Sequence, residues 1–80
     1  MKYIIVGYGG VELPIIFDEI IDHFDMVKGS VDDVISAGFV KFYPGKTFEV
    51  DCYGKSVTLK KQSRGEVDSQ IILRQMVKDY

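Results

Sequence analysis

The sequence has few of the residues on which several classes of protein depend. Cys52 is the only cysteine, so no intrachain disulfide can form and a cysteine-type zinc site is excluded. A single thiol is typical of a protein from a reducing, cytoplasmic setting. The longest aliphatic runs are as short as Ile4–Val6, far below the ~20 apolar residues that span a bilayer. The first residues also lack a secretory signal pattern, so we expect a cytoplasmic protein without a membrane segment.

The rest of the composition is typical of a small folded domain. Apolar residues make up 46% of the 80 residues and the formal net charge is only −2, which argues against disorder. A chain of this length supports one core, so we expect a single domain over residues 1–80. Such a core gives modest stability unless self-association adds to it.

The N-terminal segment has the pattern of a β-hairpin. Residues 2–8 are rich in Tyr, Ile and Val, and Gly9–Gly10 offers a two-residue turn that tolerates positive φ. The apolar pattern resumes over residues 11–17, where Pro14 favours a sheet edge or a bulge.

A short amphipathic helix is predicted over residues 18–28. Asp18 stands at the N-cap position and Gly29 at the C-terminal stop. From Asp18 onward the period changes from two to about 3.6 residues. The expected apolar stripe is Ile20, Ile21, Phe24 and Val27, and the expected acidic face is Asp18, Glu19, Asp22 and Asp25.

The middle of the chain is predicted to form a three-stranded antiparallel meander. Its strands cover residues 34–43, 47–53 and 56–60, with a type II turn at Tyr43–Lys46. Inward-facing side chains are expected to be Phe48, Val50, Cys52, Val57 and Leu59.

A second helix is predicted over residues 64–78. Ser63 and Glu66 have the spacing of a capping box, and no Gly or Pro follows Gly65. The expected order is therefore ββ-α-βββ-α, an α+β domain with two helices packed on one face of an antiparallel sheet.

No set of residues has the spacing of a catalytic or cofactor site. Gly7, Gly9 and Gly10 do not complete a dinucleotide-binding G-x-G-x-x-G, because Glu12 occupies the third glycine position. His23 is expected to be exposed, at the edge of the acidic face, and Cys52 to be a small buried hydrophobe. No spacing brings these two residues together, so we expect no enzyme, no cofactor and no metal site.

Charge is distributed unevenly along the chain. Residues 1–40 carry two lysines against seven acids, whereas residues 41–80 carry eight basic residues against five acids. Three interpretations of the acidic face stay open: an ordinary solvated face, a surface that docks on a basic nucleic-acid-binding site of another protein, or a weak divalent-metal site.

Two further surfaces could bind a partner. Val67 and Ile71 project from the second helix away from its Ile72/Met76 stripe, so they either pack on the preceding loop or form a homodimer or partner contact. The meander interleaves basic and aromatic residues, a pattern that can hold single-stranded nucleic acid, here through Lys41, Tyr43, Lys46 and Tyr53.

Four stretches of the chain resemble a group of small uncharacterised bacteriophage and prophage proteins. These stretches are residues 14–17, 34–40, 54–59 and 63–68. The resemblance implies expression inside a bacterial host cell and carries no activity. Small acidic phage proteins of this kind often bind and alter a host protein.

The leading hypothesis is a non-enzymatic protein-interaction domain, in its specific form a phage-encoded inhibitor of a host defence or regulatory protein. The expected contact residues are Asp18, Glu19, Asp22, Asp25, Val67 and Ile71. The alternative is a single-stranded nucleic-acid-binding module that uses the meander. A small enzyme using Cys52 or His23 ranks third.

Overall fold

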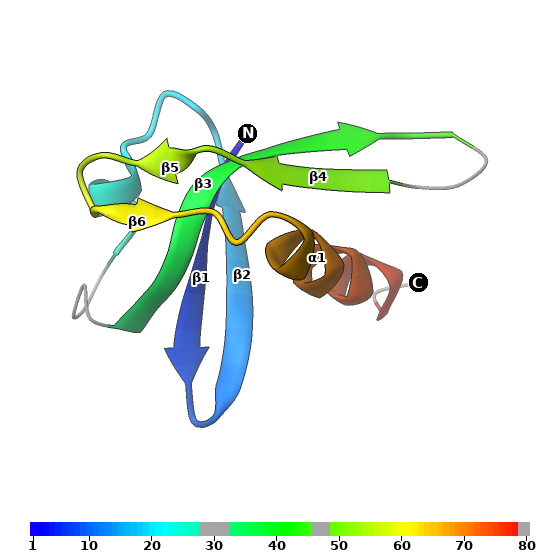
Figure 1. Ribbon diagram of the computed structural model, residues 1–80, viewed down its shortest axis with the longest axis horizontal. Coiled ribbons are helices and arrows are strands. Elements are labelled where there is room, and N and C mark those ends of the chain that lie inside the picture. Colours follow the sequence, from blue (N-terminus) through cyan, green and yellow to red (C-terminus); the bar gives the residue numbers. More distant parts are fainter. Residues whose placement is uncertain (28–32, 46–48, 79–80) are drawn as a thin grey trace.

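The computed structural model describes residues 1–27, 33–45 and 49–78. Figure 1 shows a four-stranded antiparallel sheet, a two-stranded ribbon and one α-helix. The strands of the sheet lie in the order β2-β1-β3-β4. Its elements are β1 (Lys2–Tyr8), β2 (Val11–Phe17), β3 (Val34–Tyr43) and β4 (Glu49–Tyr53). The other elements are the 3₁₀ turn η1 (His23–Met26), the ribbon strands β5 (Lys55–Ser56) and β6 (Lys61–Gln62), and the helix α1 (Glu66–Lys78).

The predicted β1–β2 hairpin is confirmed. Gly9 and Gly10 both have positive φ, at 58° and 79°, which is the requirement of a tight two-residue hairpin turn. Tyr8 pairs with Val11, and the register continues to Lys2 and Phe17. β2 is an edge strand, so Pro14 lies at a sheet edge, as the sequence predicted.

β3 joins the two parts of the sheet. Its first half pairs with β1 and its second half with β4, and the strand bends between them (Figure 1). Gly38 lies at this bend, where a Cβ atom would stand 2.5 Å from the Tyr53 carbonyl oxygen and 3.1 Å from Ser63 Cβ. Only glycine therefore allows the chain after β4 to cross β3 so closely.

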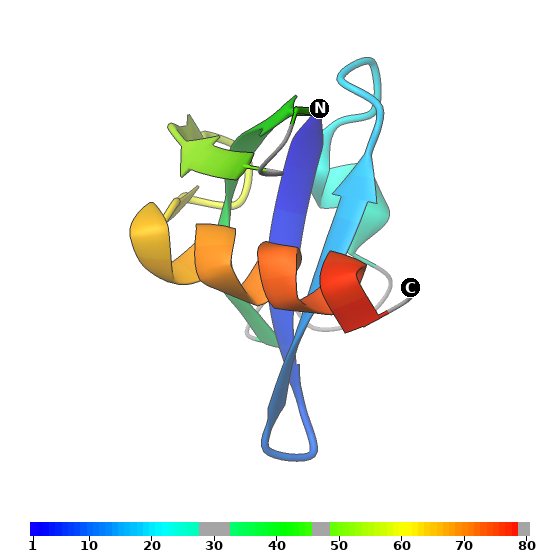
Figure 2. The same ribbon diagram turned by 90° about the vertical axis from the view of Figure 1, so that its right-hand side faces the viewer.

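The predicted fold class is wrong, because only one of the two expected α-helices forms. α1 lies across one face of the sheet, and η1 lies on the opposite face (Figure 2). In the described part of the segment predicted as the first helix, residues 18–27, a 3₁₀ turn at 23–26 stands in place of a helix. The described part of the chain is thus a mostly-β arrangement with one helix, and the predicted Gly29 stop lies outside the described residues.

The prediction of a third meander strand over residues 56–60 is also wrong. Residues 57–60 form a turn, and the short strands on either side of it pair with each other as a separate ribbon. Leu59 is buried as expected, but Val57 is 76% exposed. Phe48 and Lys46, with part of the predicted Tyr43–Lys46 turn, lie outside the described residues.

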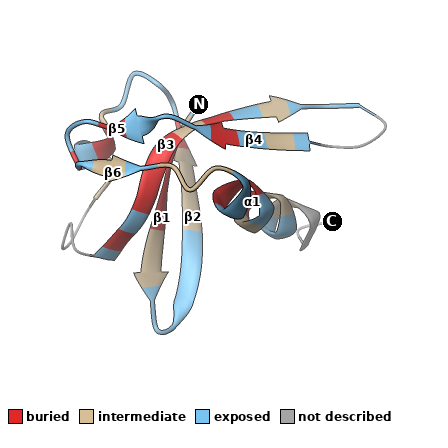
Figure 3. Ribbon diagram, viewed as in Figure 1, coloured by how far each residue is buried: buried red, intermediate tan, exposed pale blue. Residues whose placement is uncertain are grey.

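The sheet is buried on both faces, which divides the core in two (Figure 3). On the α1 face, the buried side chains are Tyr3, Ile5, Val40, Cys52 and Ile72. On the opposite face they are Ile4, Phe17, Val34, Ala37 and Leu59. Because successive side chains of a strand point to opposite faces, the unbroken apolar run of β1 supplies both halves of the core.

α1 is confirmed, but its start is built differently from the predicted capping box. The Ser63 hydroxyl accepts a hydrogen bond from the Gly65 N–H, and Asp68 accepts one from the Arg64 N–H. Glu66 instead accepts from Gln70 on the exposed side of the helix. In the predicted capping box, Glu66 accepts a hydrogen bond from a backbone N–H at the start of the helix. In the structure Asp68 accepts this kind of hydrogen bond instead.

Candidate functional site

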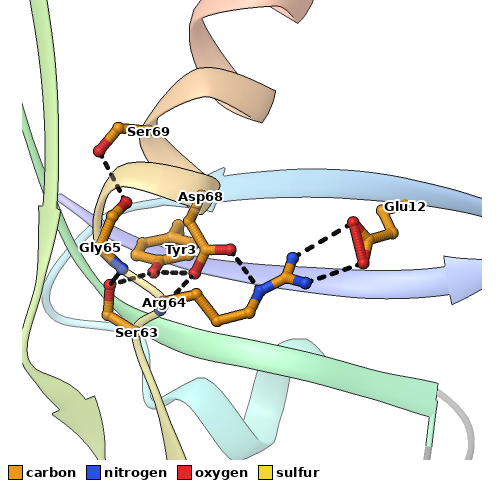
Figure 4. Close-up of polar contacts among 7 residues, drawn as sticks. All are labelled: Tyr3, Glu12, Ser63, Arg64, Gly65, Asp68 and Ser69. Atoms are coloured by element: carbon orange, nitrogen blue, oxygen red, sulfur yellow. Dashed lines mark hydrogen bonds and ion pairs between the residues drawn. The ribbon is translucent and has the colours of Figure 1, made fainter.

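A buried carboxylate fixes α1 on the sheet (Figure 4). Asp68 is fully buried and accepts hydrogen bonds from the Tyr3 hydroxyl at 2.5 Å and from Arg64 Nε at 2.8 Å. The Arg64 guanidinium then reaches the hairpin, where its terminal nitrogens donate to Glu12 at 2.9 and 3.3 Å. One arginine thus ties the helix, the core tyrosine and the edge strand together.

The titration of this cluster follows from its contacts. Burial raises the pKa of Asp68, but the hydrogen bonds from Tyr3 and from the backbone and side chain of Arg64 outweigh burial, and the net pKa is lowered. Burial, together with the hydrogen bond to Asp68, raises the pKa of Tyr3. The stable state is therefore an ionised Asp68 beside a neutral tyrosine and a charged arginine. These contacts explain the position of α1 on the sheet.

The two residues considered for catalysis are buried and lie apart. Cys52 is on the α1 face, and burial raises the pKa of its thiol. The prediction of an exposed His23 is wrong: the ring is 4% exposed and Nε2 donates to the Gly38 carbonyl oxygen at 2.8 Å. It packs edge-on between Phe17 and Phe39, on the other face of the sheet. Cys52 and His23 are therefore not a nucleophile–base pair.

No group of three or more metal-ligating side chains occurs among the residues that the structure describes. None of the helices described is long and apolar enough to cross a membrane.

The predicted nucleic-acid surface is only partly basic. Lys41, Tyr43 and Tyr53 do share one face of the β3–β4 hairpin, and Lys41 Nζ lies 5.4 Å from the centre of the Tyr53 ring. Directly across the hairpin, however, Asp51 pairs with Lys41 and Glu49 pairs with Tyr43. Among the described residues of this face, one lysine therefore stands against two acids, which is an unfavourable balance for a phosphate backbone; Lys46 lies outside the described residues.

The four acidic residues of the predicted helix lie on an irregular loop, and each has a different role. Asp18 accepts a hydrogen bond from the Ile20 N–H, and Glu19 forms an ion pair with the Met1 amine at 2.8 Å. Asp22 caps η1, whereas Asp25 is exposed and has no ion pair among the described residues. They do not form the single stripe that a helix would give.

Asp22 connects this loop to the 57–60 turn. Its Oδ1 accepts from the Phe24 N–H at 2.9 Å and from the Thr58 hydroxyl at 2.7 Å. The first of these hydrogen bonds, with help from the second, lowers the pKa of Asp22. Two segments far apart in the sequence therefore meet at one ionised carboxylate.

Large apolar side chains are exposed around this junction. Ile20 is 88% exposed, Val57 76% and Phe24 55%, although Ile20 and Phe24 were expected to face the core. Val27 packs against the sheet as expected, whereas Ile21 is 38% exposed; His23 and Met26, which were not expected there, pack beside Val27. We call the resulting feature the acidic loop surface. It consists of the exposed apolar residues Ile20, Phe24 and Val57 and the four acidic residues of the same loop, Asp18, Glu19, Asp22 and Asp25.

The other predicted contact residues lie on α1. Val67 is 51% exposed, while Ile71 is half-buried and packs against the core of the α1 face. Ile71 also lines a groove of about 630 Å³ between the helix and the hairpin tip. We call this feature the α1 groove. Its lining residues are Gly10, Val11, Glu12, Ile71, Arg74 and Gln75.

Sequence reasoning missed Val57 and the Tyr3–Asp68–Arg64–Glu12 cluster. Arg64 and Asp68 have the i, i+4 spacing of a helical ion pair, which was the one local indication available. Comparison with known proteins adds no assignment, because no protein-family model, curated protein or solved structure matches the chain.

Proposed function

We propose that this protein is a non-enzymatic interaction domain that binds a partner protein through the acidic loop surface. The observation that carries this proposal is the exposure of Ile20, Phe24 and Val57 on two loops that Asp22 and Thr58 hold together. Scattered exposed apolar residues are ordinary, but a group of them at one junction is typical of a contact surface.

The energetics favour the same interpretation. Complete burial of one large apolar side chain is worth about 1.5–3 kcal/mol. The fold leaves that stabilisation unused at Ile20 and Phe24, whose segment has the pattern of a helix that would bury them. A partner that covers these side chains would recover it.

The charges around the apolar centre indicate the chemistry of the partner. Asp18 and Asp25 are exposed and have no ion pair among the described residues. An apolar centre with an acidic rim complements a surface that has an apolar centre and a basic rim. A basic site of a host protein, such as one that binds nucleic acid, fits this description. Inhibition of a host defence or regulatory protein is the specific form of the proposal, which rests on the resemblance to phage proteins.

Capture from a nuclease-treated bacterial lysate tests the proposal. The wild-type protein should retain one stoichiometric protein, identified by mass spectrometry, and Ile20→Ser and Phe24→Ser should each lose it. Val67→Ser and Tyr43→Ser are controls, because they change apolar residues on other elements that are about as exposed as Phe24. Loss of capture with Val67→Ser alone would instead assign the contact to α1.

Salt and charge reversal test the acidic rim separately. Asp25→Lys is the cleanest substitution, because Asp25 supports no side-chain contact that the structure describes, whereas Asp22 caps η1 and holds Thr58. Capture should weaken with rising ionic strength and with Asp25→Lys. Retention of material from an untreated lysate, with none retained after nuclease treatment, would contradict the proposal and favour the nucleic-acid alternative.

A further inference from the structure

The α1 groove has the properties of a second binding site. Val11 and Ile71 give it an apolar lining, and Arg74 and Gln75 stand on its helical side. It lies on the α1 face of the sheet, whereas η1, beside the acidic loop surface, lies on the opposite face (Figure 2). The two features are therefore independent surfaces of one molecule.

The groove carries a positive charge that no carboxylate neutralises among the described residues. Glu12 is neutralised by Arg64, which binds both of its carboxylate oxygens. Arg74 donates from Nε to the Gln70 carbonyl oxygen, and no carboxylate among the described residues forms an ion pair with it. A complementary ligand therefore presents an apolar side chain next to a free carboxylate.

The acidic loop surface of the same chain has this chemistry. Ile20 is the most exposed of the large apolar residues described, and the carboxylate of Asp18 lies two residues before it. A molecule cannot place its own loop in its own groove. Val11 begins β2 and Asp18 follows its end, and the seven residues of this strand separate the two by about 20 Å.

We propose that the acidic loop surface of one copy of this protein docks into the α1 groove of a second copy. Ile20 packs on Val11 and Ile71, and the free carboxylates of the loop lie against Arg74. The proposal rests on the same loop surface as the proposed function. A partner protein and a second copy then compete for the loop, so that self-association covers the exposed apolar side chains until a partner displaces it.

Such a contact is head-to-tail, because it joins two different surfaces. Each copy in an assembly then keeps one free loop and one free groove, and the assembly grows with concentration unless it closes into a ring. This property distinguishes the proposal from a two-fold symmetric dimer, in which both copies use the same surface.

Sedimentation velocity over a concentration series is the test. Wild-type protein should show a mass that rises with concentration. Arg74→Glu blocks the groove and Ile20→Lys blocks the loop, and each should raise the dissociation constant by about tenfold or more, since each places like charges together. An equimolar mixture of the two variants should associate more tightly than either variant alone, because the intact loop of Arg74→Glu fits the intact groove of Ile20→Lys.

Matched variants control for net charge. Lys41→Glu and Tyr43→Lys introduce the same charge changes on the β3–β4 hairpin, and each should associate as the wild type does. Wild-type protein that stays monomeric at all concentrations would overturn the proposal, as would a mixture of Arg74→Glu and Ile20→Lys that remains monomeric. Neither result affects capture of a partner from lysate, so the failure of this inference is separable from failure of the proposed function.

Discussion

The two faces of the sheet are covered in different ways. On one face, α1 buries Ile72 in the core, and a buried carboxylate, Asp68, fixes the helix to Tyr3 and Arg64. On the other face, the cover consists of η1 and the 57–60 turn, held by Asp22 at the surface. The carboxylate that anchors the first cover is buried, whereas the carboxylate that anchors the second lies at the surface.

This difference accounts for how firmly each side is held. Hydrogen bonds to a buried charged group are worth about twice those between neutral groups, so the α1 side is fixed in one arrangement. The loop side relies on Phe17, His23 and Leu59 beneath it and leaves Ile20 and Val57 outside. The tightly built side thus supports the sheet, while the loosely covered side presents apolar surface.

The largest effect should come from Asp68→Asn. This change leaves the hydrogen-bond donors of Tyr3 and Arg64 without a carboxylate, and we expect the free energy of unfolding to fall by about 3–4 kcal/mol. Denaturant titration measures the loss. Asp51→Asn, on the exposed side of β4, is the control and should stay within about 0.5 kcal/mol of wild type. A loss of stability smaller than that caused by His23→Ala, on the opposite face, would contradict the view that the α1 side is the more firmly held.

His23→Ala tests the other cover. The ring is packed between Phe17 and Phe39 and bonds the Gly38 carbonyl, so its removal leaves a cavity and an unpaired acceptor. We expect a loss of about 2–3 kcal/mol in the same titration. An unchanged stability would mean that η1 contributes nothing to the fold.

The sequence predicted those elements whose local pattern agrees with their final packing. The β1–β2 hairpin has a turn that only positive φ satisfies, and α1 has a continuous apolar stripe with an i, i+4 ion pair at its start. The segment predicted as the first helix has a period of 3.6 residues, but tertiary contacts favour a loop with a 3₁₀ turn there. His23 packs inward between two phenylalanines and Asp22 bonds Thr58, 36 residues away, and neither contact leaves a trace in local spacing.

The prediction of a third meander strand was wrong for a related reason. Residues 56–60 alternate like a strand, yet the chain turns at 57–60, where Lys60 adopts a φ of 56°. The close crossing at Gly38 brings Ser63 past β3, so the chain after β4 must turn back to reach it. Of the candidate site, the sequence supplied the acidic residues but not the exposure of the apolar residues among them.

Acidification should weaken the α1 side. The pKa of Asp68 is lowered in the folded state, so its contribution to stability is complete above the unfolded value near 4 and is lost as the pH falls through the folded pKa. Asp68→Asn should remove this part of the acid sensitivity. Unfolding midpoints measured from pH 7 downward compare the two proteins, and parallel curves would contradict the assignment.

The smallest effect on stability should come from the acidic loop surface. Ile20→Ser and Val57→Ser change side chains that are largely exposed, and each should shift the free energy of unfolding by no more than about 0.5 kcal/mol. A loss above 1–2 kcal/mol, on the scale expected for a buried residue, would show that these residues pack in solution and are not available to a partner.

The central claim is the proposal that the exposed apolar residues of the loop side bind a partner protein, while the buried polar contacts of the α1 side hold the helix on the sheet. The most direct test is the double variant Ile20→Ser/Val57→Ser, measured both for unfolding by denaturant and for capture of the lysate protein. The account predicts wild-type stability, within about 1 kcal/mol, together with loss of capture. Full capture by a stably folded double variant would contradict it and leave α1 or the hairpin tip as the contact.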